Sequence, residues 1–309
     1  MKTKGDSILT LSFNKFGGGV IGATALLLFT FSAAAQNLFV SDWSSEHIFE
    51  YTPAGAQTTF ASGLAAPEGI AFNSAGNLFE ADEVTESINE FTPTGARTTF
   101  ASGLSGPASL AFDQSGNLFE GDLTSGKIYK FSPGGTRTTF ATGLNSPYGL
   151  AFNNAGDLFE ADEGSGNIYE FTPGGTRTTF ATGLLGPFGV AFDSLGDLFV
   201  GNAAGGATGQ GTIVEIKPGG ARSVFATGLN NPQQLAFNNA GDLFEADFYS
   251  GKINEFTPGG TESTFASGLA YPSGLAFQGT VLPVPEPTSL AFAGLCGLAA
   301  LAATRRRRN

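Results

Sequence analysis

Carboxyl groups dominate the chemistry open to this chain, because its other reactive side chains are scarce. The sequence holds 27 Asp and Glu residues but only 1 His and 1 Cys. A Ser-His-Asp or Cys-His triad would depend on His47, and Cys296 lies in an apolar C-terminal stretch. Zinc sites built from several His and Cys residues are excluded, as is a disulfide within the chain. We therefore assign no catalytic residue.

Two carboxyl positions recur along the chain. An Asp closes a Leu-Phe-x-x-Asp anchor in five units, at Asp42, Asp82, Asp122, Asp162 and Asp247, with Asn202 in the sixth. We expect this Asp to accept hydrogen bonds from backbone amides in the turn that follows it. A Glu stands two residues earlier in four units, at Glu80, Glu120, Glu160 and Glu245, where Val40 and Val200 occupy the others.

These four glutamates share a strand face with the Asp that follows each of them. Burying an unpaired carboxylate is costly, so we expect them to meet water, a cation or Lys and Arg. A hard divalent cation such as Ca²⁺ remains the alternative, and no other cofactor is expected. Its candidate ligands are Glu68, Glu80, Asp82, Glu120, Glu160 and Glu245.

The residues that differ between units are the better candidates for one specific site. They lie beside a recurring proline or shortly after the Leu-Phe-x-x-Asp anchor, and they include the only Trp. We expect ten of them at one mouth of a central channel: Trp43, Glu68, Glu83, Glu86, Tyr148, Phe188, Gln233, Phe248, Tyr249 and Tyr271. Aromatic rings beside carboxylates suit a sugar or a peptide. Ordinary loop variation is the alternative.

The elements that position these residues belong to one unit written six times. The prolines of a Gly-Leu-x-x-Pro anchor fall at Pro67, Pro107, Pro147, Pro187, Pro232 and Pro272. The spacing is 40 residues except before Pro232, where it is 45, and the insertion falls in 203–211. Each unit reads as four short strands separated by Gly, Pro and Asn turns, as at 69–72, 78–82, 88–91 and 97–101. This pattern predicts an all-β fold, a six-bladed β-propeller of four-stranded blades.

The phase of the repeat predicts how the ring closes. The repeats begin with a second strand at 37–42 and end with a first strand at 272–277. One blade must then combine three N-terminal strands with one C-terminal strand. Closure of this kind leaves no free edge between the first and last units.

The ends of the chain are targeting segments. Residues 1–35 combine Lys2, Lys4 and Lys15 with an apolar run and Ala33-Ala34-Ala35, which predicts a signal peptide cut by signal peptidase before Gln36. A retained membrane anchor is the alternative. The propeller is expected at 36–279. Residues 280–309 hold Pro285-Glu286-Pro287, an apolar stretch at 288–303 and four arginines, which predict a short transmembrane helix with a cytoplasmic end.

The tail resembles the PEP-CTERM sorting signal of Gram-negative bacteria. That resemblance implies an exosortase-type processing enzyme, a transient membrane anchor, and export to the outer surface or extracellular matrix of a Gram-negative cell. A tail anchor is the alternative.

The repeats resemble NHL repeats and the six-bladed propellers of the SMP-30/gluconolactonase and streptogramin-lyase kind. The resemblance rests on Pro147–Phe152, Gly156–Asp162 and Ile168–Phe171. This resemblance predicts the fold more than the function, since the same architecture occurs in binding proteins and in enzymes.

The excess of acidic residues narrows the classes of partner that this chain could bind. Between Gln36 and Pro283 the chain has 25 acidic and 8 basic residues, a surface that repels nucleic acid. Two functions remain. The first is a non-catalytic module at the cell surface that binds polysaccharide or envelope protein. The second is a metal-dependent hydrolase or lyase resembling lactonases or streptogramin lyase, for which Glu68 with Asp82 could hold the metal.

Overall fold

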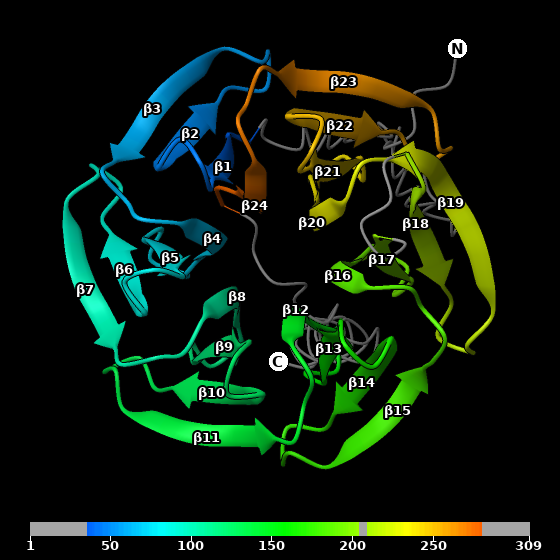
Figure 1. Cartoon of the computed structure of the whole chain (residues 1–309), viewed down its shortest axis with the longest axis horizontal. Coiled ribbons are helices and arrows are strands. Elements are labelled where there is room, and N and C mark those ends of the chain that lie inside the picture. The colour runs from blue at the N-terminus through cyan, green and yellow to red at the C-terminus, as the bar shows by residue number, and fades with distance from the viewer. Residues whose placement is uncertain (1–35, 204–208, 280–309) are drawn as a thin grey trace, which may run out of the picture. The chain divides into compact units, whose positions relative to one another are not determined.

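The computed structural model describes residues 36–203 and 209–279. In this part the chain forms 24 strands in six four-stranded sheets, arranged as blades around a common axis (Figure 1). The predicted all-β, six-bladed propeller is confirmed. The predicted signal peptide, the C-terminal span with its sorting motif, and residues 204–208 of the insertion lie outside the described residues.

Five blades place their strands in sequence order from the axis to the rim, and the sixth takes its innermost strand from the C-terminal end of the described chain. The innermost strands are β4 (Pro67–Phe72), β8 (Pro107–Phe112), β12 (Pro147–Phe152), β16 (Pro187–Phe192), β20 (Pro232–Phe237) and β24 (Pro272–Phe277). The second strands are β1 (Leu38–Asp42), β5 (Leu78–Asp82), β9 (Leu118–Asp122), β13 (Leu158–Asp162), β17 (Leu198–Asn202) and β21 (Leu243–Asp247). The third are β2 (His47–Tyr51), β6 (Ser87–Phe91), β10 (Lys127–Phe131), β14 (Asn167–Phe171), β18 (Gly211–Ile216) and β22 (Lys252–Phe256). The outermost are β3 (Gln57–Ser62), β7 (Arg97–Ser102), β11 (Arg137–Thr142), β15 (Arg177–Ala181), β19 (Arg222–Leu229) and β23 (Glu262–Ser267).

One blade closes the ring with strands from both ends of the described chain. We call it blade A, with the order β24-β1-β2-β3, and name the following blades B to F in chain order. Strand β24 pairs antiparallel with β1, and the Gln278 amide donates to the Asn37 carbonyl at 2.9 Å. The inner strands of neighbouring blades touch all the way round, from β24 through β4 and back to β20. The predicted closure is therefore confirmed.

Glycines let the inner strands approach one another. A Cβ built on Gly149 would lie 2.1 Å from the Phe188 carbonyl oxygen of the next blade. A Cβ built on the equivalent Gly69 would lie 2.3 Å from the Ala108 carbonyl oxygen. No side chain fits at Gly69 or Gly149 without a backbone shift, so these glycines let the post-proline residues of neighbouring blades come together.

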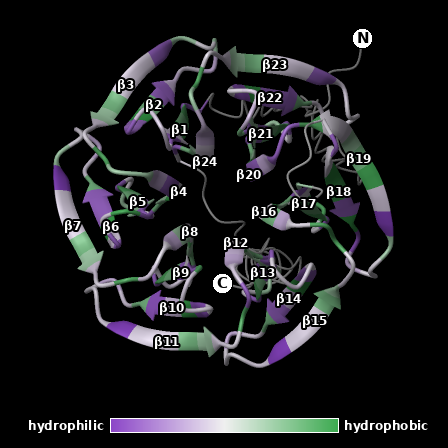
Figure 2. Cartoon of the chain, in the orientation of Figure 1, coloured by the Kyte–Doolittle hydropathy of each residue, from purple (hydrophilic) through white to green (hydrophobic). Residues whose placement is uncertain are grey.

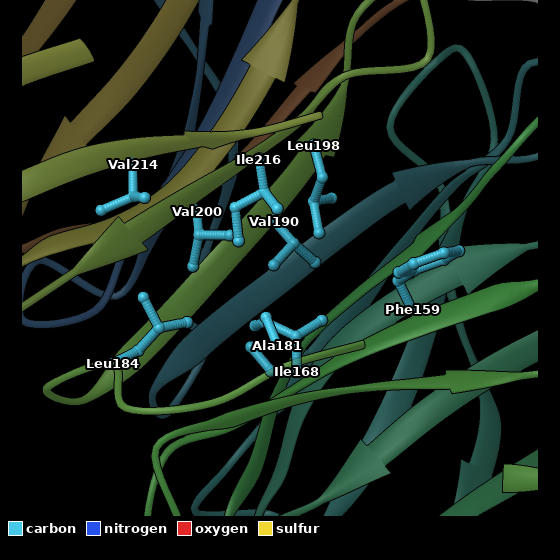
Figure 3. Close-up of a cluster of buried hydrophobic side chains, with 10 residues drawn as sticks. Phe159, Ile168, Ala181, Leu184, Val190, Leu198, Val200, Val214 and Ile216 are labelled. Carbon is cyan, nitrogen blue, oxygen red and sulfur yellow. The ribbon is translucent and has the colours of Figure 1, made fainter. Parts of the chain in front are cut away.

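Phenylalanines form the contacts between blades. Phe79 on β5 meets Phe100 of its own blade and Phe112 of the next, each edge to face at 5.0 Å. Phe100 in turn lies 5.7 Å from Phe131 of the next blade. Aliphatic side chains complete each interface, as Val190, Leu198 and Val200 of blade E do against blade D (Figure 3). Both faces of a blade are thus covered by its neighbours, which explains the apolar character of the inner strands.

Arginines link neighbouring blades at the rim, where the outer strands mix hydrophilic and hydrophobic positions (Figure 2). Arg97, Arg137 and Arg177 each donate to a glycine carbonyl of the preceding blade, at 3.1, 3.0 and 3.3 Å. Arg222 bonds the Thr182 carbonyl in the same way, at 2.6 Å. Gln57 and Glu262 stand at the equivalent strand starts of blades A and F. The rim arginines therefore join four of the six blade boundaries.

Candidate functional site

One face of the ring gathers the variable residues, and we call it the mouth face. It consists of the turns after the second strands and the loops that lead into the inner strands. Backbone hydrogen bonds tie each such turn to a loop, as from Trp43 to Tyr271 at 2.9 Å and from Glu83 to Ala66 at 3.1 Å. These bonds place both sets of residues at the same end of the blades, as the sequence predicts.

The recurring Asp holds this arrangement together. One carboxylate oxygen of Asp82 accepts from the Thr85 amide in the turn, and the other accepts from the Ala65 amide in the loop, both at 2.9 Å. Asp122 and Asp162 make the same pair of bonds. The predicted turn role is confirmed, and the link to the loop is an addition. Both oxygens of Asp82 are thus engaged with backbone amides.

A β-bulge frees the residues after each inner-strand proline from the regular ladder. In blade B the register passes from Pro67 opposite Asp82 to Ile70 opposite Glu80, and Glu68 lies within that shift. Bulges re-aim side chains, and here they do so at the ring centre. The residue after the proline differs in all six blades, so the six side chains form an asymmetric set on a symmetric frame.

Glu68 is the centre of a hydrogen-bonded group that crosses three blades. Its Oε2 accepts from the Tyr148 hydroxyl at 3.0 Å and from the Ser273 hydroxyl. Tyr148 also meets Phe188 edge to face at 4.5 Å. Gln233 lies in the same ring of positions, with its Oε1 buried and without a hydrogen-bond partner among the described residues. Tyr148 reaches Glu68 past blade C, where the small Ala108 takes the equivalent position.

Burial sets the protonation of this group. Glu68 is 6% exposed, and burial raises its pKa to about 7, although the bonds from Ser273 and Tyr148 act in the opposite direction. Burial also raises the pKa of Tyr148 well above its ordinary value, and the charge of Glu68 adds to that shift. Tyr148 is therefore a hydrogen-bond donor rather than a base near neutral pH.

An aromatic cluster lies where blades F and A meet. Phe248 and Tyr271 stack at 4.8 Å with an interplanar angle of 26°, and Tyr249 and Trp43 meet Tyr271 edge to face at 6.3 and 6.5 Å. Tyr249 is 56% exposed and Tyr271 37%. The structure thus brings together the four rings that the sequence assigns to this mouth, and it leaves two of them open to solvent.

Carboxyl groups continue this cluster into blade B. The Trp43 Nε1 donates to Glu83 Oε2 at 3.2 Å, and Glu83 is close enough to Glu68 to raise the pKa of that residue. Glu86 is exposed, with a left-handed backbone at φ 52°. One contiguous group therefore consists of Trp43, Glu83, Phe248, Tyr249 and Tyr271. The buried pair of Glu68 and Tyr148 is joined to it only through the charge of Glu83, which raises the pKa of both residues.

The four repeated glutamates lie elsewhere, inside the blade interfaces. Glu80, Glu120, Glu160 and Glu245 are all 0% exposed. The Asn89 and Asn254 amides donate to Glu80 and Glu245 at 2.9 Å, while both carboxyl oxygens of Glu120 and of Glu160 have no hydrogen-bond partner among the described residues. Bulk water does not reach these side chains, and no Lys or Arg among the described residues forms an ion pair with them, while the cation alternative stays a prediction. The structure thus buries four carboxyl groups without ionic partners.

The physical reason is that a buried carboxyl group can stay protonated. Burial raises the pKa of Glu80 to about 8, and it raises those of Glu120, Glu160 and Glu245 well above the ordinary value. A neutral acid costs far less to bury than a carboxylate does. The sequence argument considered only the charged form.

A signal for this environment lies in the facing strand. The glutamates stand opposite Asn89, Tyr129, Tyr169 and Asn254, whereas Val40 and Val200 stand opposite Phe49 and Val214. Polar residues thus face each Glu and apolar residues face each Val. Comparing these two positions across the six units would reveal a shared interior environment from sequence alone.

The described residues contain no group of three or more His, Cys, Asp or Glu side chains arranged to hold a metal ion. His47 begins β2, where its Nδ1 contacts the Ser45 carbonyl and its ring stacks on Phe49 at 5.6 Å. A hollow on the mouth face, of about 330 Å³, lies along Glu163–Gly166 and Leu184–Gly186. Across 36–203 and 209–279, no helix has the length and apolar character that a membrane span needs.

Comparison with known families identifies the tail. The PEP-CTERM protein-sorting motif matches residues 283–308, which include Pro285, Glu286 and Pro287. This match indicates an exported bacterial protein that is anchored in the membrane before exosortase processes it. No curated protein matches the chain in sequence.

Solved structures share the fold. A chain from the nidogen/laminin complex matches with a TM-score of 0.71 at 20% identity, covering 79% of this chain and 98% of that one. Streptogramin B lyase follows with a TM-score of 0.62 at 16% identity, covering 77% and 82%. A candidate gluconolactonase gives 0.61 at 16% identity, covering 74% and 84%. The chain is thus similar in fold to propellers that bind proteins and to others named as enzymes.

Proposed function

We propose that this propeller is a non-catalytic binding module, displayed on the outer surface or in the extracellular matrix of a Gram-negative bacterium, and that its mouth face binds extracellular polysaccharide. The observation that carries the proposal is the aromatic cluster of Trp43, Phe248, Tyr249 and Tyr271, with two rings open to solvent. Exposed aromatic rings in a contiguous group suit the apolar faces of sugar rings.

The surroundings of the cluster support a fixed rather than an adaptable surface. Trp43 is held by the bond from its Nε1 to Glu83, and its backbone amide donates to the Tyr271 carbonyl at 2.9 Å. Phe248 supports Tyr271 by stacking. Little side-chain entropy is then lost when a ligand covers Tyr249 and Tyr271, which favours binding.

The carboxyl groups proposed for metal chemistry are already engaged. Asp82 gives both oxygens to backbone amides, and Glu68 accepts from Tyr148 and Ser273. These contacts favour a structural use of both residues over a catalytic one.

Losing Trp43 and Tyr249 together tests the proposal. Aromatic contacts of this kind contribute about 1 kcal/mol each, so Trp43→Ala with Tyr249→Ala should weaken binding roughly tenfold to a hundredfold. The matched control removes two rim residues, Arg137→Ala with Arg177→Ala, whose guanidinium groups bond glycine carbonyls between blades. Binding would be measured against a panel of bacterial exopolysaccharides, with thermal melting to confirm the fold.

Two outcomes would contradict the proposal. Binding abolished by the rim pair and unchanged by the mouth pair would place the site on the rim. Cleavage of a bound polysaccharide on prolonged incubation, read by mass spectrometry, would make the protein an enzyme.

A further inference from the structure

Most of the charged side chains around the aromatic cluster are carboxyl groups. Blades A and B bring carboxyl groups and no Lys or Arg to the mouth face through residues 41–46, 63–68 and 81–86: Asp42, Glu46, Glu68, Asp82, Glu83 and Glu86. Asp42 and Asp82 are committed to backbone amides and Glu68 is buried. Glu46, Glu83 and Glu86 remain at least partly exposed beside the rings. Blade F supplies Lys252, at the start of β22.

Two of these glutamates occupy backbone positions that disfavour them. Glu46 and Glu86 have φ values of 64° and 52°, in the left-handed region. Blades C, D and F place glycine at the equivalent turn position, at Gly126, Gly166 and Gly251. A side chain at such a φ value strains the backbone. Blades A and B therefore carry a glutamate at a turn position where blades C, D and F carry glycine, the residue that adopts this backbone conformation with the least strain.

Aromatic faces and carboxylates attract the same kind of ligand. The face of a Trp or Tyr ring is electronegative, so it attracts a cation, and a neighbouring carboxylate strengthens that attraction. The same surface repels uronate or sulfate groups. The rings of Tyr249 and Trp43, at 6.3 and 6.5 Å from that of Tyr271, also offer a flat apolar area. This area is larger than a small cation alone would cover.

We propose that the mouth face recognises a cationic amino-polysaccharide, a glycan whose sugars carry free amines. Its sugar rings lie on Tyr249 and Tyr271, and its ammonium groups meet Glu83 and Glu86. This inference rests on the proposed function and adds the sign of the ligand's charge. Charge complementarity between an acidic, aromatic surface and a basic glycan selects this occupant over neutral and acidic glycans.

The test compares two oligosaccharides with the same sugar backbone, one with free amines and one with acetylated amines. A glucosamine hexasaccharide and its fully N-acetylated counterpart would be titrated by calorimetry at low and at physiological salt. Two exposed carboxylates contribute about 1 kcal/mol in total, so the free amine form should bind roughly tenfold more tightly at low salt. Physiological salt should reduce the difference, because exposed charges are screened.

Variants assign the charge effect to the mouth. Glu83→Gln keeps an acceptor for Trp43, and Glu86→Gly restores the residue that three other blades use. Together they should remove the preference for the amine form, so that the amine and N-acetylated forms bind with equal affinity. The control is Glu90→Gln, because Glu90 lies near the far end of β6 and bonds Asn77 there.

The outcomes separate this inference from the proposed function. Equal affinity for both forms, with loss of both in the Trp43→Ala, Tyr249→Ala variant, would overturn the charge inference and keep the binding module. Binding indifferent to the mouth variants would overturn both. A lysine hexapeptide that binds as tightly as the amine glycan would make the partner a basic peptide and overturn the glycan assignment.

Discussion

Single residues decide how closely the six inner strands approach one another. The carbonyl oxygen of each post-proline residue points at the neighbouring blade, and Gly149 and Gly69 leave the room for it. Ser109 takes the equivalent position in blade C, which shows that this requirement varies round the ring. The same crowding holds Glu68, Tyr148 and Ser273 within hydrogen-bonding reach.

Gly149→Ala should therefore destabilise the fold. Its Cβ would meet the Phe188 carbonyl oxygen at 2.1 Å, and the backbone must shift to accept it. Overpacking of this kind costs about 1 to 3 kcal/mol or more. The control is Gly219→Ala, because a Cβ there meets nothing within 4 Å. Denaturant unfolding checks both, and equal free energies of unfolding for the two variants would contradict the close-approach account.

The site residues were predictable because they break the repeat. Trp43, Phe248, Tyr249 and Tyr271 stood out as departures from near-identical units, and the structure brings them together. The bond from Tyr148 to Glu68 was not predictable, because it spans 80 residues and depends on a bulge in the inner strand. Sequence spacing indicates the ring position of a side chain but not its direction.

At the scale of strands, the least expected feature is a buried carboxyl group between the second and third strands of a blade. Four blade interfaces bury a Glu from the second strand, opposite an Asn or a Tyr of the third. The charges of Asp82, Arg97 and Glu68 act on the pKa of Glu80. The charges of Asp247 and Glu262 act on the pKa of Glu245. The negative neighbours oppose ionisation, and for Glu120 and Glu160 the arginines Arg137 and Arg177 partly favour it.

Stability should fall as the pH rises. The folded state holds the Glu80 proton up to a pKa of about 8, whereas the unfolded chain releases it near 4.5. Between these values the folded state binds more protons, so its free energy of unfolding decreases with pH. Glu80→Gln should remove this share of the dependence. The Glu80→Gln variant should be at least as stable as the wild type at pH 9. Its free energy of unfolding should rise relative to that of the wild type as the pH increases from 5.

Thermal melting of both proteins from pH 5 to 9 provides the measurement, with Glu90→Gln as the control on the outer hairpin. A stability difference between wild type and Glu80→Gln that stays constant with pH would contradict burial of a protonated Glu80.

Strand β24 closes the ring, and its loss should be severe. Deleting Pro272–Phe277 removes the inner strand of blade A and exposes the edge of β1, which promotes aggregation. A chain ending at Gly279 keeps β24 and serves as the control. Melting and size-exclusion chromatography compare the two, and unchanged melting of the shorter chain would refute the closure.

At the scale of the whole molecule, the fold was readable and the ligand was not. Six copies of a strand pattern fix blade number and closure, because the first unit lacks its inner strand and the last unit supplies only that strand. The insertion before Gly211 moved no blade out of order. Ligand identity depends on how a few turns differ, and no periodicity governs those differences.

The two ends predict a processed protein. We expect the exported form to begin at Gln36 and to lack its tail beyond the region of Pro285. Replacing Pro285, Glu286 and Pro287 with Ala should retain the tail, because the sorting motif matches residues 283–308. Mass spectrometry of cell-surface and secreted fractions reads both ends. A secreted form that still begins with Met1 would contradict cleavage.

The fluorescence of Trp43 tests the central claim most directly, because the chain has only 1 Trp and it lies in the aromatic cluster. Titration with the glucosamine hexasaccharide should change its emission in a saturable way, with the affinity that calorimetry gives. Tyr249→Ala should shift the midpoint to higher concentration, because one stacking ring is lost. Tight binding by calorimetry with unchanged Trp43 emission would place the ligand away from the mouth face and contradict the account.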